Sequence, residues 1–503
     1  DGGVSAAVCT PFMWSLYEYI WEISYRRFLA EALYSNGSRL GKLSDMFYGR
    51  PYWNLTKTKL AMSGVVGYKE REFDEDLGIK PTYEGDGVTT SLNLKSIVNS
   101  LRILTKSHSQ VNSRLRENRA SHDDLLRKYD KYLKSVSSSE QAWLDLVFRG
   151  YLLSESTYFE QIFINTVAQS IYKDKLMKHI SREEYLKLLM GLDDISHLRP
   201  YRALWKLSRK NKISNSDVTE FIDEFGYHSD KELDVTYPHF AEEPAKIRQI
   251  VAELSKLPDS ENPELETKKH KEIFDETLNK LPKNLQKTVT TLRSLLWWRE
   301  EFRDVSTKFY YLIRLYTLEL AKAYRKKHII KSEDDIWFLK ITDIKSYMRG
   351  EITANILRSI IEKNRLYYDS FRNYVPANEI GRSFDVTDFK SKIVPSDSVK
   401  GVGCSTGKVT GKARVIQDLS EINRLQRGDI LITKFTDTGW TSKFAILGGI
   451  VTEYGGVLCH AAIVSREFGI PCITCVENAM ALIKDGETIT IDGATGEIMG
   501  ENK

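Results

Sequence analysis

The sequence predicts a multidomain protein in which a large, mainly α-helical domain is followed by a small α/β domain. The first observation is that residues 4–378 contain long stretches without Gly or Pro, in which apolar residues recur at steps of three and four. The second is the change after Val394, where Pro395-Ser396-Asp397-Ser398 and several glycines precede short β-branched runs. We expect three parts: a helical domain at 1–390, a hinge linker at 391–407 and the small domain at 408–503.

Residues 299–327 show the helical pattern well. Apolar side chains follow one another there at gaps of three and four: Phe302, Val305, Phe309, Leu312, Tyr316 and Leu320. This spacing is typical of one buried face of a helix. Eight of the nine Trp residues lie in the helical part, and we expect them mainly in its core, although they could also line a pocket.

The small domain is predicted to alternate strands and helices. The predicted strands are Val409–Ile416, Ile430–Thr433, Gly449–Thr452, Cys472–Cys475 and Thr488–Asp492. The predicted helices are Leu419–Leu425, Thr441–Leu447, Ala461–Phe468 and Asn478–Ile483. Such alternation favours a sheet covered by short helices.

Composition excludes several classes of protein. Of the 503 residues 41% are hydrophobic and 28% are charged, which is ordinary globular composition. The net charge of +4 is too small for the basic surface of a nucleic-acid binder. The longest uncharged stretch, residues 2–17, is shorter than the ~20 residues that span a bilayer, so we expect no membrane segment.

Five cysteines, an odd number, argue against a disulfide framework and favour a cytoplasmic location. The stretch at residues 2–17 also lacks the basic residues that precede a signal peptide. Because the chain begins with Asp1, we expect it to be part of a longer protein.

The chemistry-bearing segment is residues 452–467. A predicted strand ends at Thr452, Gly455 and Gly456 allow a tight turn, and His460 opens a predicted helix. The unpaired amides and the positive end of the helix dipole would stabilise a phosphoryl group there and would lower the pKa of the imidazole. Since the neutral imidazole is the nucleophilic form, His460 is a candidate covalent phosphate carrier. From the spacing alone, a histidine that only caps the helix is an equal alternative.

The same segment resembles a known signature. Thr452-Glu453-Tyr454-Gly455-Gly456-Val457-Leu458-Cys459-His460-Ala461-Ala462-Ile463-Val464-Ser465-Arg466-Glu467 is similar to the phosphohistidine signature of the phosphoenolpyruvate-utilising enzymes. The similarity continues into Gly469-Ile470-Pro471 and Ile491-Asp492-Gly493, and it is seen upstream at residues 407–415. The resemblance implies that the small domain is a swivelling phosphohistidine domain of β/β/α type, with His460 as the nucleophile.

The resemblance also implies further residues and partners. Around the phosphoryl group it places Gly455, Gly456, Cys459 and Arg466, although Arg466 could instead pair with Glu467 or Glu453. In this family an ATP-grasp domain supports transfer of the β-phosphate of ATP to the histidine. We see no ATP-binding motif here, so we expect Mg²⁺ and ATP to be bound mainly by a domain outside this chain, in the same protein or on a separate polypeptide.

The helical part resembles the central domain of rifampin phosphotransferase and phosphoenolpyruvate-synthase-like proteins. The resemblance rests on residues 221–244, which include His228, on Trp298-Arg299-Glu300-Glu301-Phe302-Arg303 and on residues 334–339. It makes His228 a candidate substrate-binding residue. Arg299 and Arg303 lie one helical turn apart, a mildly repulsive arrangement that a bound phosphate or carboxylate of the substrate could justify. The alternatives are that the two arginines pair with acidic neighbours and that His228 is packed or capping, because the family reads Gly-His-Arg where this chain has Gly226-Tyr227-His228.

Three other sequence patterns resemble known functional motifs but do not fit them. Gly403-Cys404-Ser405-Thr406-Gly407 fits the hydrolase G-x-S-x-G motif but follows a loop and opens a strand. Gly407-Lys408 lacks the remaining residues of a Walker site. Cys472 and Cys475 would point to opposite faces of a strand, so we expect no metal site there.

The sequence therefore predicts a phosphotransferase of the phosphoenolpyruvate-utilising type. It would carry phosphate on His460 from an ATP-grasp domain to a small-molecule acceptor bound by the helical domain. The alternative is a non-catalytic phosphocarrier or regulatory module that a partner protein phosphorylates.

Overall fold

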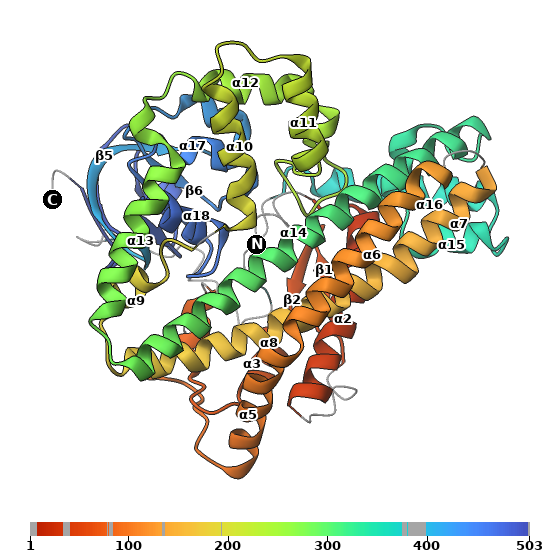
Figure 1. Ribbon diagram of the computed structural model, residues 1–503. Helices are drawn as coiled ribbons and strands as arrows, with labels where there is room; N and C mark the ends of the chain where they lie inside the picture. The colour runs from red at the N-terminus through yellow and green to blue at the C-terminus, as the bar shows by residue number, and fades with distance from the viewer. Residues whose placement is uncertain are drawn as a thin grey trace.

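The computed structural model describes residues 8–33, 41–77, 79, 84–132, 136–192, 194–374, 380 and 399–500. A large helical part forms an elongated body, and the C-terminal sheet lies at one end of it (Figure 1). The predicted fold class, a mainly helical domain followed by an α/β domain, is confirmed.

Helix α14 (Lys283–Lys326) is the long central element of the helical domain. Its predicted apolar face is buried, including Phe302, Phe309 and Leu320. Around it the domain is built from α2 (Pro11–Ala32), α3 (Leu55–Met62), α4 (Glu70–Leu77), α5 (Leu94–Ser109), α6 (Val111–Tyr132), α7 (Val136–Leu144), the π-helical η2 (Asp145–Tyr151), α8 (Leu152–Met177), η6 (Glu333–Phe338), α15 (Ile341–Met348) and α16 (Ala354–Phe371).

One part of the expected helical region is not helical. Strands β1 (Ser44–Phe47) and β2 (Arg50–Trp53) form an antiparallel hairpin, with Phe47 opposite Arg50. The two residues between them, Tyr48 and Gly49, have φ angles of 52° and 70°, as the tight hairpin turn requires. The turn lacks the common Asn-Gly or Asp-Gly signal, which is why the periodicity did not reveal it.

A helical arm extends from the body and surrounds the sheet domain. It contains α9 (Arg182–Leu188), η3 (Ser196–Leu198), α10 (Arg199–Ser208), α11 (Asn215–Phe225), η4 (Phe240–Glu242), α12 (Pro244–Leu254), η5 (Asp259–Glu261) and α13 (Pro263–Asn279). In Figure 1 helices α10, α12 and α13 lie around the sheet, and α13 contacts helix α18 (His460–Phe468).

The C-terminal domain is a mixed sheet. Its strands are β3 (Val399–Lys400), β4 (Val402–Ser405), β5 (Lys408–Val415), β6 (Ile430–Thr433), β7 (Gly449–Thr452), β8 (Cys472–Thr474), β9 (Thr488–Asp492) and β10 (Glu497–Gly500). Their order across the described sheet is β3-β10-β9-β5-β6-β7-β8-β4. Strands β5 to β8 are parallel to their neighbours in that run, and the other pairs are antiparallel.

Short helices cover the sheet, and its strands are apolar on both faces. Leu431 and Ile450 pack with Ala462 of α18 on one face, whereas Ile432 and Val451 pack on the other. The remaining helical turns are η8 (Leu419–Arg424), η9 (Thr438–Trp440), α17 (Thr441–Phe444) and α19 (Ala479–Leu482). Strands buried on both faces are typical of a parallel sheet.

The sheet begins earlier than the sequence analysis placed it. Residues 399–405, which we expected in the linker at 391–407, form β3 and β4, and β4 pairs antiparallel with β8. This pairing joins segments some seventy residues apart, and Gly401 and Gly403 at its start read as linker residues. The rest of the expected hinge, residues 391–398, lies outside the described residues.

The two domains are docked against each other. Thr438 Oγ1 donates to the carbonyl oxygen of Ser229 at 2.9 Å, and Lys443 Nζ lies 2.8 Å from Glu253 Oε2. Phe468 packs edge-on against Tyr201, with 5.1 Å between ring centroids. Residues of the sheet domain thus meet the arm with polar, charged and apolar contacts.

Among the described helices, none is both long enough and apolar enough to cross a membrane.

Candidate active site

His460 lies where two parallel strands end. Strands β6 and β7 pair in parallel and finish at Thr433 and Thr452, so the loops that follow them leave the same edge of the sheet. The first loop carries Thr436 to Trp440, and the second leads to His460, the first residue of α18. The carboxyl ends of parallel strands are the usual position of ligand sites in α/β sheets.

The turn before His460 depends on glycine. Gly455 has a φ of 124°, and a Cβ there would lie 2.8 Å from Cys459 Sγ. Cys459 precedes the helix with extended backbone, and its N–H donates to the carbonyl oxygen of Gly456 at 3.0 Å. Gly455, Gly456 and Cys459, all predicted near the phosphoryl group, therefore shape the approach of the chain to His460.

Two hydroxyl groups hold the imidazole of His460. Nδ1 lies 2.9 Å from Thr436 Oγ1, and Nε2 lies 3.3 Å from Thr441 Oγ1. The ring of Phe444 stands perpendicular to the imidazole, with 5.8 Å between centroids. All three contacts come from the segment after β6, so the sheet domain itself fixes the orientation of the ring.

The helical domain controls the charge of His460. Burial lowers the pKa of its imidazole well below the ordinary value, and the neighbouring Arg303 and His197 lower it further, while Glu300 acts in the opposite direction. The predicted neutral state thus has a cause that the sequence analysis did not name. Arg303 and Glu300 lie on α14, across the seam between the domains.

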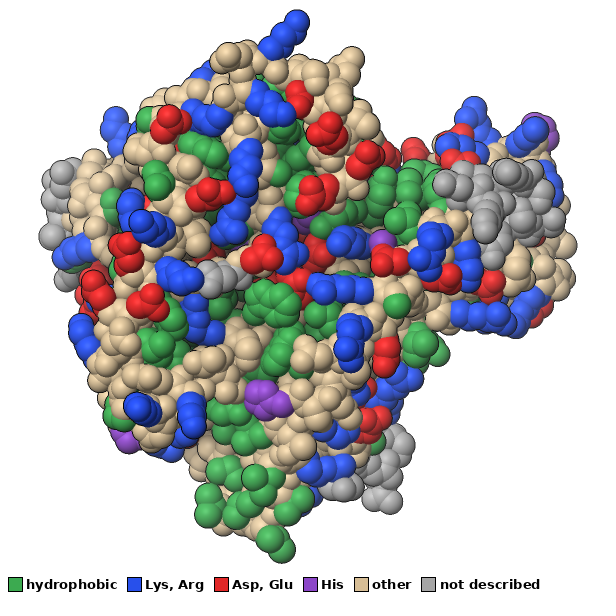
Figure 2. Space-filling view, viewed as in Figure 1, with side chains coloured by type: hydrophobic (Ala, Val, Ile, Leu, Met, Phe, Trp, Pro, Cys, Tyr) green, Lys and Arg blue, Asp and Glu red, His purple; other side chains and the backbone are tan. Residues whose placement is uncertain are grey.

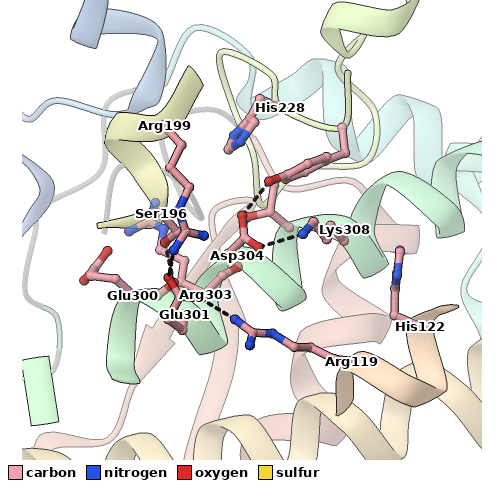
Figure 3. Close-up of polar contacts among 12 residues, drawn as sticks. Arg119, His122, Ser196, Arg199, His228, Glu300, Glu301, Arg303, Asp304 and Lys308 are labelled. Atoms are coloured by element: carbon pink, nitrogen blue, oxygen red, sulfur yellow. Dashed lines mark hydrogen bonds and ion pairs between the residues drawn. The ribbon is translucent and has the colours of Figure 1, made fainter. Parts of the chain in front are cut away.

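A row of charged side chains on α14 lies between the arm and α6 (Figure 3). Glu301 binds both Arg199 of α10, at 2.7 Å, and Arg119 of α6. Asp304 accepts a hydrogen bond of 2.5 Å from Tyr227 and pairs with Lys308 at 2.8 Å. In Figure 2 red and blue side chains accordingly gather across the middle of the visible face, where α14 passes in Figure 1.

The two predicted arginines have different surroundings. Arg299 Nη2 donates to the carbonyl oxygen of Leu458 at 2.8 Å, so it binds the sheet domain two residues before His460. Arg303 Nε lies 3.9 Å from Glu232 Oε2. Burial alone would lower the pKa of Arg303, but Glu232 and Glu300 outweigh this effect and raise it. Arg303 is therefore a permanent buried cation beside His460.

Arg466 is buried and bonds backbone carbonyl groups. Its guanidinium donates to the carbonyl oxygens of Cys404, at 2.7 Å, and Val457. It thereby ties β4 to the segment before α18. The expected contact of Arg466 with a phosphoryl group stays a prediction.

His228 lies on the arm side of the seam. Its Nδ1 is 2.6 Å from Glu232 Oε1, and both residues are buried. Figure 3 shows its ring above the α14 row, next to Tyr227. The structure thus brings His228, Arg303 and Arg299 to the same seam as His460.

Within the described residues, no group of three or more His, Cys, Asp or Glu could hold a metal ion. Cys472 lies in β8, whereas Cys475 follows the strand with a φ of 58°.

A cavity of about 320 Å³ lies at another part of the seam. Leu198, Glu266 and Thr267 of the arm line it together with Phe444 and Phe468 of the sheet domain. Phe444 thus contacts both this cavity and the imidazole of His460.

Comparison with known protein families matches both sides of this seam. Residues 425–496 match the mobile domain of PEP-utilising enzymes, and residues 209–305 match the fourth domain of rifampicin phosphotransferase. The resemblance to the phosphoenolpyruvate-utilising enzymes is confirmed. The first match contains His460 and the threonines that hold it, and the second contains His228, Glu232 and Arg303.

Individual proteins are similar over larger parts of the chain. The rifampicin phosphotransferase of Bacillus cereus is 31% identical over 297 residues, which cover 56% of this chain and 34% of that protein. The rifampicin phosphotransferase of Bacillus subtilis is 27% identical, over 61% of this chain and 37% of that protein. The prodigiosin synthesizing transferase of Serratia marcescens is 27% identical, over 76% of this chain and 42% of that protein. The chain thus spans well under half the length of these relatives.

Sequence reasoning missed Thr436, Thr441 and His197. Thr436 and Thr441 lie 24 and 19 residues before His460, so no local spacing connects them to it. One signal was available, because predicted strands 430–433 and 449–452 are both followed by polar loops. If those strands are parallel neighbours, their loops must meet at one edge.

Proposed function

We propose that this chain is the phosphate-carrying and acceptor-binding part of an ATP-dependent phosphotransferase. The observation that carries the proposal is the position of His460: it is held neutral at a helix start, and it faces Arg303 of the other domain. The similarity to proteins named rifampicin phosphotransferase supports a small-molecule acceptor.

The contacts of His460 select its reactive nitrogen. If Nδ1–H donates to Thr436 Oγ1, at 2.9 Å, the lone pair lies on Nε2, whose contact with Thr441 is longer, at 3.3 Å. Nε2 then attacks the phosphorus atom while the Thr436 hydroxyl keeps the tautomer fixed. Thr441 can donate to a phosphoryl oxygen once it is in place.

The acceptor side supplies positive charge. Phosphoryl transfer needs the negative charge on the equatorial oxygens to be stabilised, and positioned arginines do this well. Arg303 is buried beside His460, and Arg299 lies one helical turn earlier on α14. We assign both to the phosphoryl group in the docked state.

The phosphate donor in this proposal is Mg-ATP, bound by an ATP-grasp domain outside this chain. We assign no metal ligand to this chain. Its own residues accept, carry and deliver the phosphoryl group.

Release of AMP tests the proposal. The chain is mixed with Mg-ATP, with and without an ATP-grasp domain from the same protein or from a rifampicin phosphotransferase. We expect AMP only when the ATP-grasp domain is present, and we expect His460→Ala to abolish it. His270→Ala, which removes another buried histidine near the seam, is the matched control and should leave AMP release intact. AMP release by the chain alone, or by His460→Ala, would contradict the proposal.

A further inference from the structure

His228 and Glu232 form a buried pair on the arm. His228 Nδ1 lies 2.6 Å from Glu232 Oε1, and the two residues are only 6% and 5% exposed. Among the described residues, no group bonds His228 Nε2, which is itself buried. An imidazole whose Nδ1–H is held by a carboxylate keeps its lone pair on Nε2, where it can accept a proton.

The loop that carries His228 contacts the sheet domain near His460. Thr438 of the sheet domain donates to the carbonyl oxygen of Ser229, the residue after His228. Thr436, two residues before Thr438, bonds His460 Nδ1. One short segment of the sheet domain therefore contacts both the carrier histidine and the loop of the buried pair.

Arg303 connects the two histidines electrostatically. It lies 3.9 Å from Glu232 Oε2, and its charge lowers the pKa of His460. Figure 3 shows that His228 lies above the α14 row, on the side where Arg199 also lies. His239 offers a contrast, because its nearest carboxylate, Glu242, is 3.8 Å from Nδ1 and does not hold the ring closely.

We propose that His228, held by Glu232, is the proton acceptor for a hydroxyl group of the small molecule that receives the phosphate. This inference rests on the proposed function and specifies the acceptor chemistry. An acceptor that reacts through an O–H group must lose its proton during transfer, so it needs a base, whereas a carboxylate acceptor does not. A base at the acceptor side of the seam therefore selects a hydroxyl compound.

The acceptor oxygen forms a bond to phosphorus as the bond between phosphorus and His460 Nε2 breaks. The bonding electrons return to Nε2, which leaves a neutral imidazole because Nδ1 retains its proton. The hydroxyl proton passes to His228 Nε2, and the resulting imidazolium is stabilised by Glu232. His228 is thus a catalytic residue in this proposal and Glu232 a positioning residue.

The test follows phosphate loss from a prelabelled protein. His460 is labelled with ³²P-phosphoramidate, a small phosphoryl donor, and His460→Ala serves as the blank. The loss of label is timed in water alone and with rifampicin as a hydroxyl-bearing probe. We expect His228→Gln to accept label normally but to lose it about 100-fold more slowly to whichever acceptor reacts. Glu232→Gln should slow the loss less, and added imidazole should rescue His228→Gly.

The matched control is His239→Gln, which removes another buried histidine of the same segment. It should lose label at the wild-type rate. Equal rates for His228→Gln, His239→Gln and the wild type with both acceptors would overturn the proposal while leaving the carrier role of His460 intact. Failure of the wild type to take label at His460 would instead refute the proposed function. If thermal unfolding shows that His228→Gln is misfolded, the isosteric variant Glu232→Gln replaces it in the test. Loss of label from Glu232→Gln at the wild-type rate would then overturn the proposal.

Discussion

At the scale of single residues, the chemistry depends on a histidine kept neutral by its surroundings. The imidazole is oriented by Thr436 of its own domain, and its pKa is lowered first by burial and then by Arg303 of the other domain. Glu300 is a negative charge beside these cations. Burial acts to raise its pKa, but His197, Arg299 and Arg303 lower it to about 2. Docking thus changes the proton affinity of His460 as well as its position.

Replacing Arg303 tests this coupling. Because the positive charge disfavours protonation of His460, Arg303→Gln should raise the pKa of the imidazole toward the ordinary value of about 6.5. As the pH falls, the variant should therefore protonate His460 at a higher pH than the wild type does. NMR titration of the His460 ring proton measures this. Lys308→Gln, which removes a cation one turn farther along α14, is the control, and identical titrations of His460 in wild type and Arg303→Gln would refute the coupling.

At the scale of elements, the sequence located the strands and the helix that carry the site. The ranges 430–433, 449–452 and 488–492 were predicted as observed, because short β-branched runs bounded by turn residues specify buried strands well. Strand β4 was missed because it pairs with β8, far along the chain, and because its glycine, Gly403, is a residue type common in linkers. His460 was found from its local pattern, whereas Thr436 and His197 could be found only from the fold that brings them to it.

The turn at Gly455 gives a prediction at this scale. Gly455→Ala would place a Cβ 2.8 Å from Cys459 Sγ on backbone with a φ of 124°. A strained residue of this kind costs about 1–3 kcal/mol, and relief of the strain must shift the start of α18. We expect a lower unfolding temperature and slower labelling of His460 by phosphoramidate. Gly500→Ala, which meets open space, is the control, and equal effects of both substitutions would contradict this account.

At the scale of the whole molecule, the structure shows the sheet domain docked against the helical domain. The seam contains Arg299 bound to the carbonyl oxygen of Leu458, a charged pair between Lys443 and Glu253, and the ring contact of Phe468. Exposed ion pairs and single hydrogen bonds contribute little each, so such a seam can open at modest cost. A histidine that receives phosphate at one site and delivers it at another requires this kind of reversible contact.

The central claim is that His460 carries the phosphate, and the most direct measurement is to locate the phosphate on the protein. The complete protein is labelled from [β-³²P]ATP, quenched in base and mapped by mass spectrometry. We predict a single labelled peptide containing His460, with phosphate that is stable in base and lost in acid, as a phosphoramidate bond requires. Stable label on any other residue, or label that persists in His460→Ala, would contradict the account.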